Sequence, residues 1–156
     1  PYFLSRPRRF GKSLLLSTFE TYFKGQKELF EGLAIEKMET EWKKFPVLHL
    51  DLNAKKYETP ADLIAMLNQA LEKWEAVYGN EKKDRSPEER FAYVIERAYE
   101  QAGCGVVVLV DEYDKPLLQA LDNDALLEDY RKTLKAFYGV LKSADRYLFC
   151  FPYGSY

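Results

Sequence analysis

The segment Gly105-Val-Val-Val-Leu-Val-Asp-Glu112 is a continuous apolar run that ends in two acids. An unbroken β-branched run of this length is typical of a parallel strand that is covered by helices on both faces. Open α/β sheets bind their ligands at the carboxyl ends of such strands, which is where Asp111 and Glu112 would lie. The segment therefore predicts a buried strand that carries two carboxylates to a ligand-binding edge.

A second motif, Gly11-Lys12-Ser13, lies between a short apolar stretch at 2–5 and an apolar-rich helix expected from Lys12 to about Lys24. This is the strand–loop–helix context of a phosphate-binding loop. Free N–H groups and the dipole at the helix start favour phosphate, Lys12 would reach the β- and γ-phosphates, and Ser13 would take one magnesium position. Because Arg6 stands where the usual loop has its first glycine, the tripeptide alone is a weak signal. Together with the strand ending in Asp-Glu, it predicts a site for a magnesium-bound nucleoside triphosphate.

The rest of the chain alternates strand patterns with helix patterns. The expected strands are 2–5, 46–51, 105–110 and 146–151. The first expected helix is 12–24, and the second is capped by Thr59 with Pro60 and Asp62 and ends at Gly79. The third begins with a Ser86–Glu89 capping box and ends near Gly103. The fourth is capped at 122–124 and carries an apolar stripe from Leu127 to Leu141. Short helical turns are expected over 26–40. This alternation predicts an α/β fold of three layers, with a mostly parallel sheet between helices.

Composition narrows the class of protein. The 156 residues suit one domain, and a content of 47% hydrophobic and 31% charged residues is typical of a soluble globular chain. A net charge of −2 and the lack of a long apolar run indicate neither a nucleic-acid surface nor a membrane span. Cys104 and Cys150 are interpreted as reduced core thiols of a cytoplasmic protein. Since the chain begins at Pro1 and stops just after a strand pattern, we expect a fragment of something longer.

The two motifs in their wider context resemble a known family. Tyr2-Phe-Leu-Ser-Arg-Pro-Arg-Arg-Phe-Gly-Lys-Ser-Leu-Leu-Leu-Ser17 and Val110-Asp-Glu-Tyr-Asp-Lys-Pro116 are similar to the AAA-ATPase-like domain of bacterial and archaeal ATP-binding proteins, which also use arginine at the position of Arg6. The resemblance spans nearly all of 1–156 and implies a P-loop NTPase core with strand order 5-1-4-3-2, here incomplete at both ends. In that order 146–151 would lie between the first strand and the Asp111 strand. Many members carry a C-terminal nuclease-like domain of the PD-(D/E)XK type.

The motifs and the resemblance together assign the site. The cofactors would be ATP and Mg²⁺, with Ser13 and Asp111 as metal ligands, Glu112 as the general base that activates water, and Lys12 as the second catalytic group. The nucleotide-binding residues of this Walker A loop would be Arg8, Arg9, Phe10, Gly11, Lys12, Ser13 and Leu14. For Arg8 and Arg9 a solvated basic loop and a contact with a neighbouring subunit stay open as alternatives. His49 is interpreted as a strand residue and not as a ligand, and Asp51 as a strand-ending acid that would face the nucleotide edge.

Three functional readings follow from these residues. The first is an ATPase module, and the second is a nucleotide-gated switch or adaptor with negligible turnover. The second is motivated by the lack of an identifiable arginine finger, and by Tyr153 at the position where the family usually has a sensor threonine, for which Ser155 is a substitute candidate. The third reading couples the module to a nucleic-acid-processing domain beyond this segment. The expected partners are the nucleotide and either further copies of the chain or a nuclease-like domain.

Overall fold

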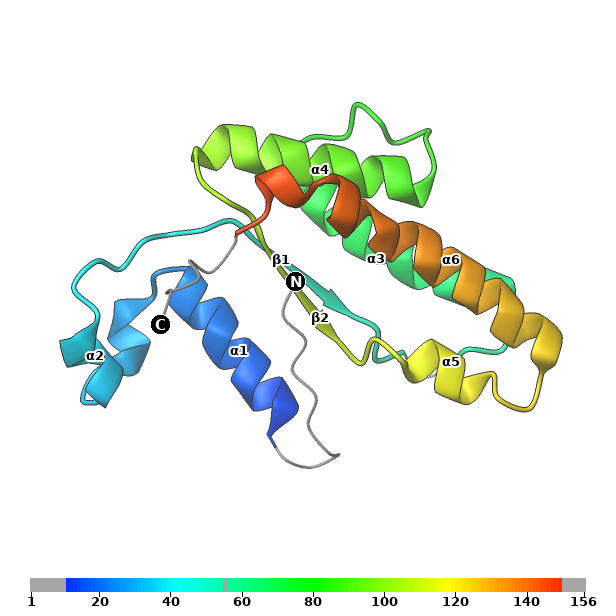
Figure 1. Cartoon of the computed structure of the whole chain (residues 1–156), viewed down its shortest axis with the longest axis horizontal. Helices are drawn as coiled ribbons and strands as arrows, with labels where there is room; N and C mark the ends of the chain where they lie inside the picture. The colour runs from blue at the N-terminus through cyan, green and yellow to red at the C-terminus, as the bar shows by residue number, and fades with distance from the viewer. Residues whose placement is uncertain (1–10, 55, 150–156) are drawn as a thin grey trace.

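Two parallel strands form the centre of the part of the chain that the structure describes, residues 11–54 and 56–149 of this computed structural model (Figure 1). The elements in chain order are α1 (Lys12–Phe23), η1 (Lys27–Phe30), α2 (Ala34–Met38), β1 (Val47–Asp51), α3 (Pro60–Tyr78), α4 (Pro87–Ala102), β2 (Val107–Asp111), α5 (Lys115–Gln119), α6 (Asp124–Ser143) and η2 (Asp145–Tyr147). The strands predicted at 46–51 and 105–110 and the helices predicted between them are therefore confirmed within one or two residues.

The strands β1 and β2 run in register, so that Val47 pairs with Val107 and Asp51 pairs with Asp111. The opposite edge of β2 meets the segment around Leu148 through a single parallel bridge to Val106. This segment therefore lies on the side of β2 away from β1. Because a Cβ at Gly105 would come within 2.8 Å of the Phe149 backbone, the close approach requires glycine there.

The strand predicted over 146–151 is wrong for its first residues, since Asp145–Tyr147 forms a turn of 3₁₀ helix. The ladder between this segment and β2 is limited, among the described residues, to the bridge at Leu148. The strand expected at 2–5 lies outside the described residues. The described sheet thus supports a mixed α/β fold with a small parallel sheet, and the five-stranded order stays a prediction.

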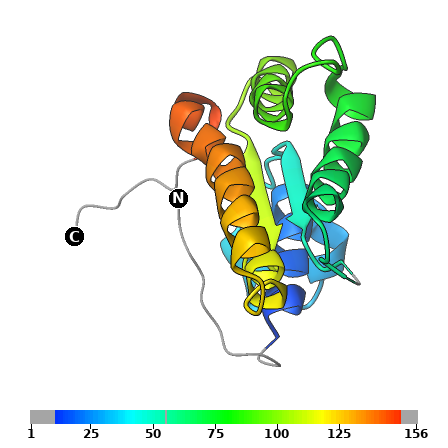
Figure 2. The ribbon, with the colours of Figure 1, turned by 90° about the vertical axis from the view of Figure 1, so that its right-hand side faces the viewer.

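Helices lie on both sides of the two strands, with α1 on one side and α3, α4 and α6 on the other (Figures 1 and 2). The alternation of side chains along β1 explains this arrangement. Leu48 and Leu50 are fully buried in the core with α3, α4 and α6, whereas His49 points to α1 and hydrogen-bonds Glu20.

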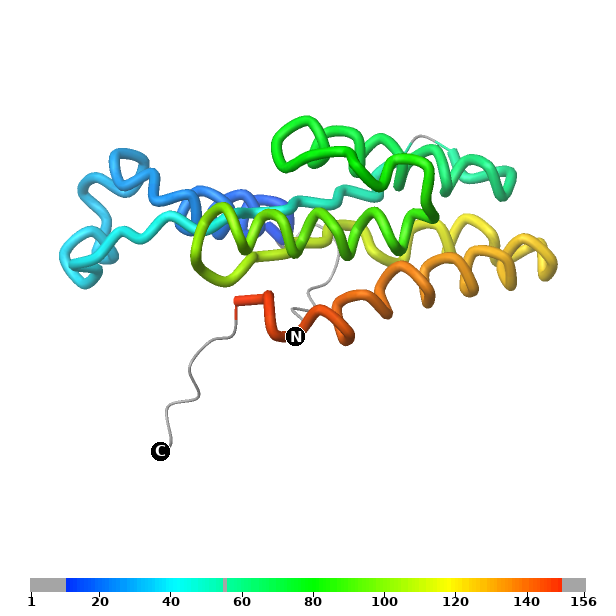
Figure 3. The backbone as a smooth tube through the Cα atoms, turned by 90° about the horizontal axis from the view of Figure 1, so that it is seen from above, coloured from blue at the N-terminus to red at the C-terminus, as the bar shows by residue number. Residues whose placement is uncertain are grey.

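The main core lies where α4 packs between α3 and α6 (Figure 3). The ring of Phe91 on α4 stacks on Trp74 of α3, with 5.5 Å between centroids, and on Phe137 of α6, with 4.4 Å between centroids. The apolar stripe predicted from Leu127 to Leu141 is buried at Tyr130, Leu134 and Phe137, whereas its two end residues are only partly buried. Cys104 is only half-buried and forms no disulfide within the described residues, so its predicted place in the core is wrong.

The helix starts follow the predicted caps. The carboxylate of Asp62 accepts the N–H groups of Glu58 and Thr59, both at 2.8 Å, at the start of α3. The hydroxyl of Ser86 accepts the N–H of Glu89 at 3.3 Å, and the Asn123 side chain accepts the N–H of Leu126 at 3.1 Å. The bonds from Glu89 and Leu126 satisfy helix N–H groups that have no partner within the helix, and the bonds from Glu58 and Thr59 hold the chain just before α3. None of the helices in the described ranges is both long and apolar enough for a bilayer span.

A buried ion pair joins α3 to α4. Arg90 and Glu75 are 8% and 6% exposed; both Nε and Nη2 of Arg90 bond Glu75 Oε1, and Nη1 donates to Asn68 Oδ1 at 2.8 Å. Taking two charges out of water is costly, so each group depends on its partner.

We predict that Arg90→Met destabilises the chain by roughly 3–5 kcal/mol, because it leaves the Glu75 carboxylate buried without a counterion. The double variant Arg90→Met/Glu75→Leu is expected to recover most of this loss, since both charges are then gone. Urea unfolding of the wild type and the two variants measures both effects. Equal stability of the single and double variants would contradict the account.

The cap of α3 predicts a pH dependence. Hydrogen bonds from the Glu58 and Thr59 N–H groups lower the pKa of Asp62 below its ordinary value of 3.8. A depressed folded pKa stabilises the fold above pH 3.8 and this contribution is lost as the pH falls through the folded pKa. Asp62→Ala should therefore lower the melting temperature at neutral pH, with a gap that narrows below pH 3.8. A gap that is constant over this range would show that the charge has no part in the cap.

Candidate functional site

The first turn of α1 and the carboxyl end of β2 meet although they are far apart in the sequence. Ser13 Oγ donates a hydrogen bond of 3.0 Å to Asp111 Oδ2 across 98 positions of sequence. The Lys12 ammonium lies 3.6 Å from Asp111 Oδ1 and also 3.6 Å from Glu112 Oε1. The four side chains that the sequence singled out from the two motifs are therefore neighbours.

Within the described residues, the start of α1 has no side-chain cap of its own. Gly11 stands at the N-cap with φ 71° and ψ 25°, a left-handed conformation that glycine adopts without steric cost. The first turn holds no acidic residue, and no side-chain cap bond is present at Gly11. The positive end of the helix dipole is thus not offset by a local carboxylate cap, which suits an anion such as phosphate.

The carboxylate of Asp111 is held in place from several sides. Its side chain is largely buried, with the residue 7% exposed. Oδ1 accepts the N–H of Glu112 at 2.9 Å, Oδ2 accepts the Ser13 hydroxyl, and the peptide oxygen accepts the N–H of Leu52 at 3.1 Å. A group bonded in this way has a defined orientation before any ligand arrives.

Glu112 has an unusual backbone conformation. With φ 53° it is the one residue other than glycine with positive φ among the described residues. Its carboxylate is about one-third exposed and faces Lys12, and its peptide oxygen accepts the N–H of Lys115 at 3.0 Å. The left-handed conformation lets the chain turn sharply just after β2, so that the side chain stays at the strand end.

Other residues at this edge have simpler roles. Asp51 lies beside Asp111 in the register of the sheet, but its side chain is exposed and Oδ1 accepts the N–H of Asn53 at 2.9 Å. His49 Nδ1 and Glu20 Oε2 are 2.8 Å apart, in agreement with its interpretation as a strand residue. Asp114 stands just before α5, where its peptide oxygen accepts the N–H of Leu118.

Several of the predicted site residues are not placed at the site by the structure. Arg8, Arg9 and Phe10 lie outside the described residues, as do Tyr153 and Ser155. Leu14 lies in the first turn of α1, but its side chain is 72% exposed and contributes no wall to a binding site in the described part of the chain. For this residue the backbone N–H is the group available to a ligand.

One contact at the site was not predicted from the sequence. The Lys115 ammonium bonds Asn53 Oδ1, so that the turn carrying Glu112 is joined to the loop after β1. A second bond, from Tyr57 N–H to Gln119 Oε1 at 2.8 Å, joins the same loop to α5. No local pattern could have indicated these contacts, because each joins residues 62 positions apart.

The oxygen donors of the site fit a magnesium ion that is bound together with a nucleotide. Ser13 offers a hydroxyl and Asp111 a carboxylate, which are the hard oxygen ligands that Mg²⁺ prefers. The described residues contain no cluster of three or more His, Cys, Asp or Glu side chains that could hold a metal ion. Such a cluster is not required, since Mg²⁺ commonly takes one or two protein oxygens and completes its shell with phosphate oxygens and water.

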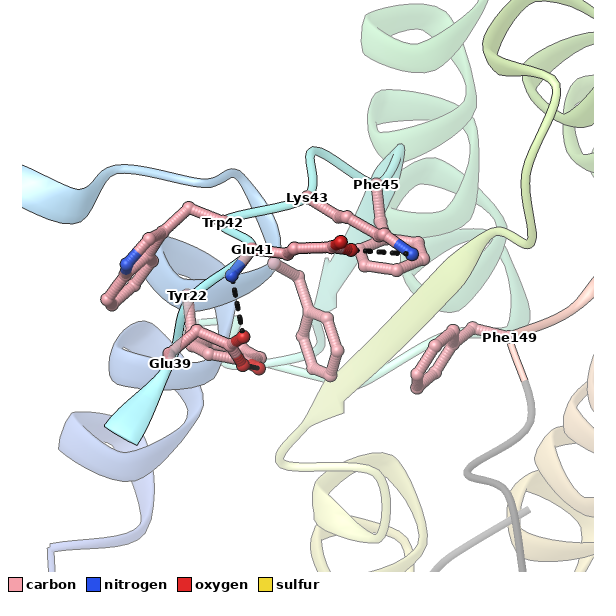
Figure 4. Close-up of a pocket in the computed structure, with 8 residues that line it drawn as sticks. Tyr22, Glu39, Glu41, Trp42, Lys43, Phe45 and Phe149 are labelled. Atoms are coloured by element: carbon pink, nitrogen blue, oxygen red, sulfur yellow. Dashed lines mark hydrogen bonds and ion pairs between the residues drawn. The ribbon is translucent and has the colours of Figure 1, made fainter. Parts of the chain in front are cut away.

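A cavity of about 290 Å³ lies at the other end of α1 (Figure 4). Tyr22 and Phe23, in the last turn of the helix, line it together with Trp42, Phe45 and Phe149. At a rise of about 1.5 Å per residue this end is roughly 15 Å from Lys12, so the cavity is separate from the site. A shallow depression next to Arg90, lined from α3 and α4, is also remote from it.

The comparisons with known proteins agree with the motifs. A family model described as "Predicted AAA-ATPase" matches residues 1–153. An uncharacterized protein in the vnfD 5' region of Azotobacter chroococcum mcd 1 is 37% identical over 147 residues, which are 94% of this chain and 28% of that protein. The chain thus spans less than a third of the length of this relative. No solved structure matches the chain. Because the family model covers nearly every residue, the chain belongs to the AAA-ATPase-like family of predicted AAA-ATPases.

Proposed function

We propose that the chain binds ATP together with Mg²⁺ and hydrolyses it to ADP and inorganic phosphate. The observation that carries the proposal is the meeting of Lys12 and Ser13 with Asp111 and Glu112 at one edge of the sheet. The membership of the chain in a family of predicted AAA-ATPases supports ATP as the nucleotide.

The phosphates would be held at the start of α1. The Lys12 side chain is one-quarter exposed, and its ammonium group lies between the two acids. A phosphate entering at the helix start could therefore pair with this ammonium group. The backbone N–H groups after Gly11 add donors, and the absence of a Cβ there leaves room for the phosphate. Within the described residues, binding would then rest on the positive charge of Lys12 and several fixed dipoles.

The metal would be held by Ser13 and Asp111. Mg²⁺ held there would neutralise the negative charge that develops on the phosphate oxygens during transfer. The hydrogen bond between Ser13 and Asp111 already keeps these two oxygens 3.0 Å apart.

Glu112 would act on water. Its carboxylate lies 3.6 Å from the Lys12 ammonium, the group assigned to the terminal phosphates. In the proposed step Glu112 accepts a proton from a water molecule whose oxygen forms a bond to the γ-phosphorus. The bond from the γ-phosphorus to the β–γ bridging oxygen breaks, ADP keeps that electron pair, and inorganic phosphate is released.

A nucleotide-gated switch with negligible turnover is the competing function. It would use the same phosphate and metal groups, and it would differ only in the rate of the hydrolytic step. The position of Glu112 next to Lys12 favours hydrolysis, because a switch does not need a base there.

Removing the cation at the helix start should weaken binding. We predict that Lys12→Met raises the dissociation constant for Mg-ATP by roughly 10- to 100-fold, because one charge-assisted contact with phosphate is lost. Isothermal titration calorimetry measures this change. Lys24→Met is the matched control, because Lys24 directly follows the last residue of α1 and also pairs with a glutamate, Glu20. Equal affinity of the wild type and Lys12→Met would exclude the proposed phosphate site.

Removing the base should separate binding from turnover. We predict that Glu112→Gln keeps the affinity for Mg-ATP within a fewfold and lowers kcat by roughly 10²- to 10⁴-fold. Phosphate release measures turnover, and Glu128→Gln, at an exposed position of α6, is the control. A wild type that binds Mg-ATP but releases phosphate no faster than Glu112→Gln would instead support the switch.

A further inference from the structure

We propose that Asn53 and Lys115 form a clamp that positions Glu112 for hydrolysis, a role that rests on the proposed function. Among the described residues, the side chains of Asn53 and Lys115 bond no residue of the site, and Lys115 reaches Glu112 only through its backbone N–H. Their side chains bond each other across the gap between the loop after β1 and the turn after β2. They would therefore be positioning residues and not catalytic ones.

The need for a clamp comes from the backbone of Glu112. Its φ of 53° is a conformation that residues with a Cβ adopt at a cost, so the surrounding structure has to hold it. On one side the Glu112 N–H donates to Asp111 Oδ1 at 2.9 Å. On the other side the Glu112 peptide oxygen accepts the Lys115 N–H at 3.0 Å. The position of Lys115 thus controls one of the two bonds that define the turn.

Asn53 provides a fixed anchor for Lys115. Its N–H donates to Asp51 Oδ1 at 2.9 Å, and the preceding residue, Leu52, donates its N–H to the Asp111 peptide oxygen at 3.1 Å. The bond from Leu52 continues the pairing of β1 with β2 to the residue after β1, and the bond from Asn53 to Asp51 is local. The acceptor oxygen for Lys115 is therefore attached to the sheet itself.

The loop that carries Asn53 is also held further along. The Tyr57 hydroxyl donates to the Leu52 peptide oxygen at 2.6 Å, and burial raises the pKa of Tyr57 to about 12, so it remains a donor at neutral pH. The Tyr57 N–H donates to Gln119 Oε1 on α5. Within the described part of the chain, the loop and the Glu112 turn are therefore joined by three bonds, Leu52–Asp111, Asn53–Lys115 and Tyr57–Gln119, of which only Asn53–Lys115 is formed by two side chains.

Because the Asn53–Lys115 bond is exposed, its effects on stability and on turnover are expected to differ. An exposed side-chain bond contributes little to global stability, so its removal should not unfold the chain. Catalysis is more sensitive, because a displacement of about 1 Å of a catalytic group can lower a rate by about two orders of magnitude. The clamp should therefore affect turnover while leaving the fold and nucleotide binding nearly unchanged.

The test compares Asn53→Ala, Lys115→Met and the double variant in the chain with Mg-ATP. We expect each single variant to lower kcat by roughly 10-fold, with KM and the melting temperature nearly unchanged. The double variant should lose no more than either single one, and Lys115→Arg should recover most of the rate, because arginine can still donate to Asn53. Asn80→Ala and Lys132→Met, at exposed positions elsewhere, are the matched controls.

A second readout does not depend on activity. The Lys115 amide, bonded to the Glu112 peptide oxygen, should exchange its hydrogen several-fold faster in both single variants than in the wild type, with no nucleotide present. Unchanged exchange, an unchanged kcat, additive losses in the double variant, or a raised dissociation constant at constant kcat would each overturn the clamp. If the wild type does not bind Mg-ATP, the proposed function fails, and amide exchange alone then decides whether the clamp exists.

Discussion

The hydrogen bond from Ser13 to Asp111 joins the two halves of the candidate site. The Lys12 ion pairs with Asp111 and Glu112 join the same two segments, the start of α1 and the end of β2. The acceptor of the hydrogen bond is largely buried and further bonded to the Glu112 N–H, whereas the donor residue, Ser13, is exposed, so only the acceptor end of the bond is held in a fixed frame. The positions of the Lys12 ammonium and the Glu112 carboxylate depend on this bond, because Lys12 directly precedes Ser13 and Glu112 directly follows Asp111.

The helix α1 is also attached to the sheet and to its neighbours away from the site. Glu20 bonds His49 on β1, and the hydroxyl of Tyr22 donates to Glu39 beyond α2 at 2.6 Å. These contacts prevent α1 from rotating about its own axis, which would move its first turn relative to β2. The geometry at Ser13 is therefore supported by the side chains of Glu20 and Tyr22, about two turns or more away along the same helix.

On the other face, the packing of α3, α4 and α6 supplies the burial that keeps the strands in place. The stacked rings centred on Phe91 and the buried pair of Arg90 and Glu75 make these helices one unit. Leu48 and Leu50 attach β1 to it. Because β1 pairs with β2 in register, the packing of these helices on β1 also fixes the position of Asp111 at the end of β2.

The sequence was sufficient wherever the controlling interaction is local. Period, run length and capping residues located α1, α3, α4, α6 and both central strands, but not the short helix α5. Asp62, Ser86 and Asn123 each act within three or four residues of their own position. The two motifs also predicted Lys12 and Asp111 as residues of a phosphate and metal site, and the structure places the Lys12 ammonium 3.6 Å from the Asp111 carboxylate. The final strand was predicted too early, since a run of aromatic and apolar residues does not distinguish a strand from a 3₁₀ turn that precedes it.

Only the tertiary structure could decide the contacts between distant segments. The distance between Ser13 and Asp111, the left-handed turn at Glu112 and the bond from Lys115 to Asn53 all depend on how helices pack on a sheet. The physical reason is that a hydrogen bond between residues 62 or 98 positions apart leaves no periodicity or spacing in the chain, because its partners are selected by packing and not by neighbourhood.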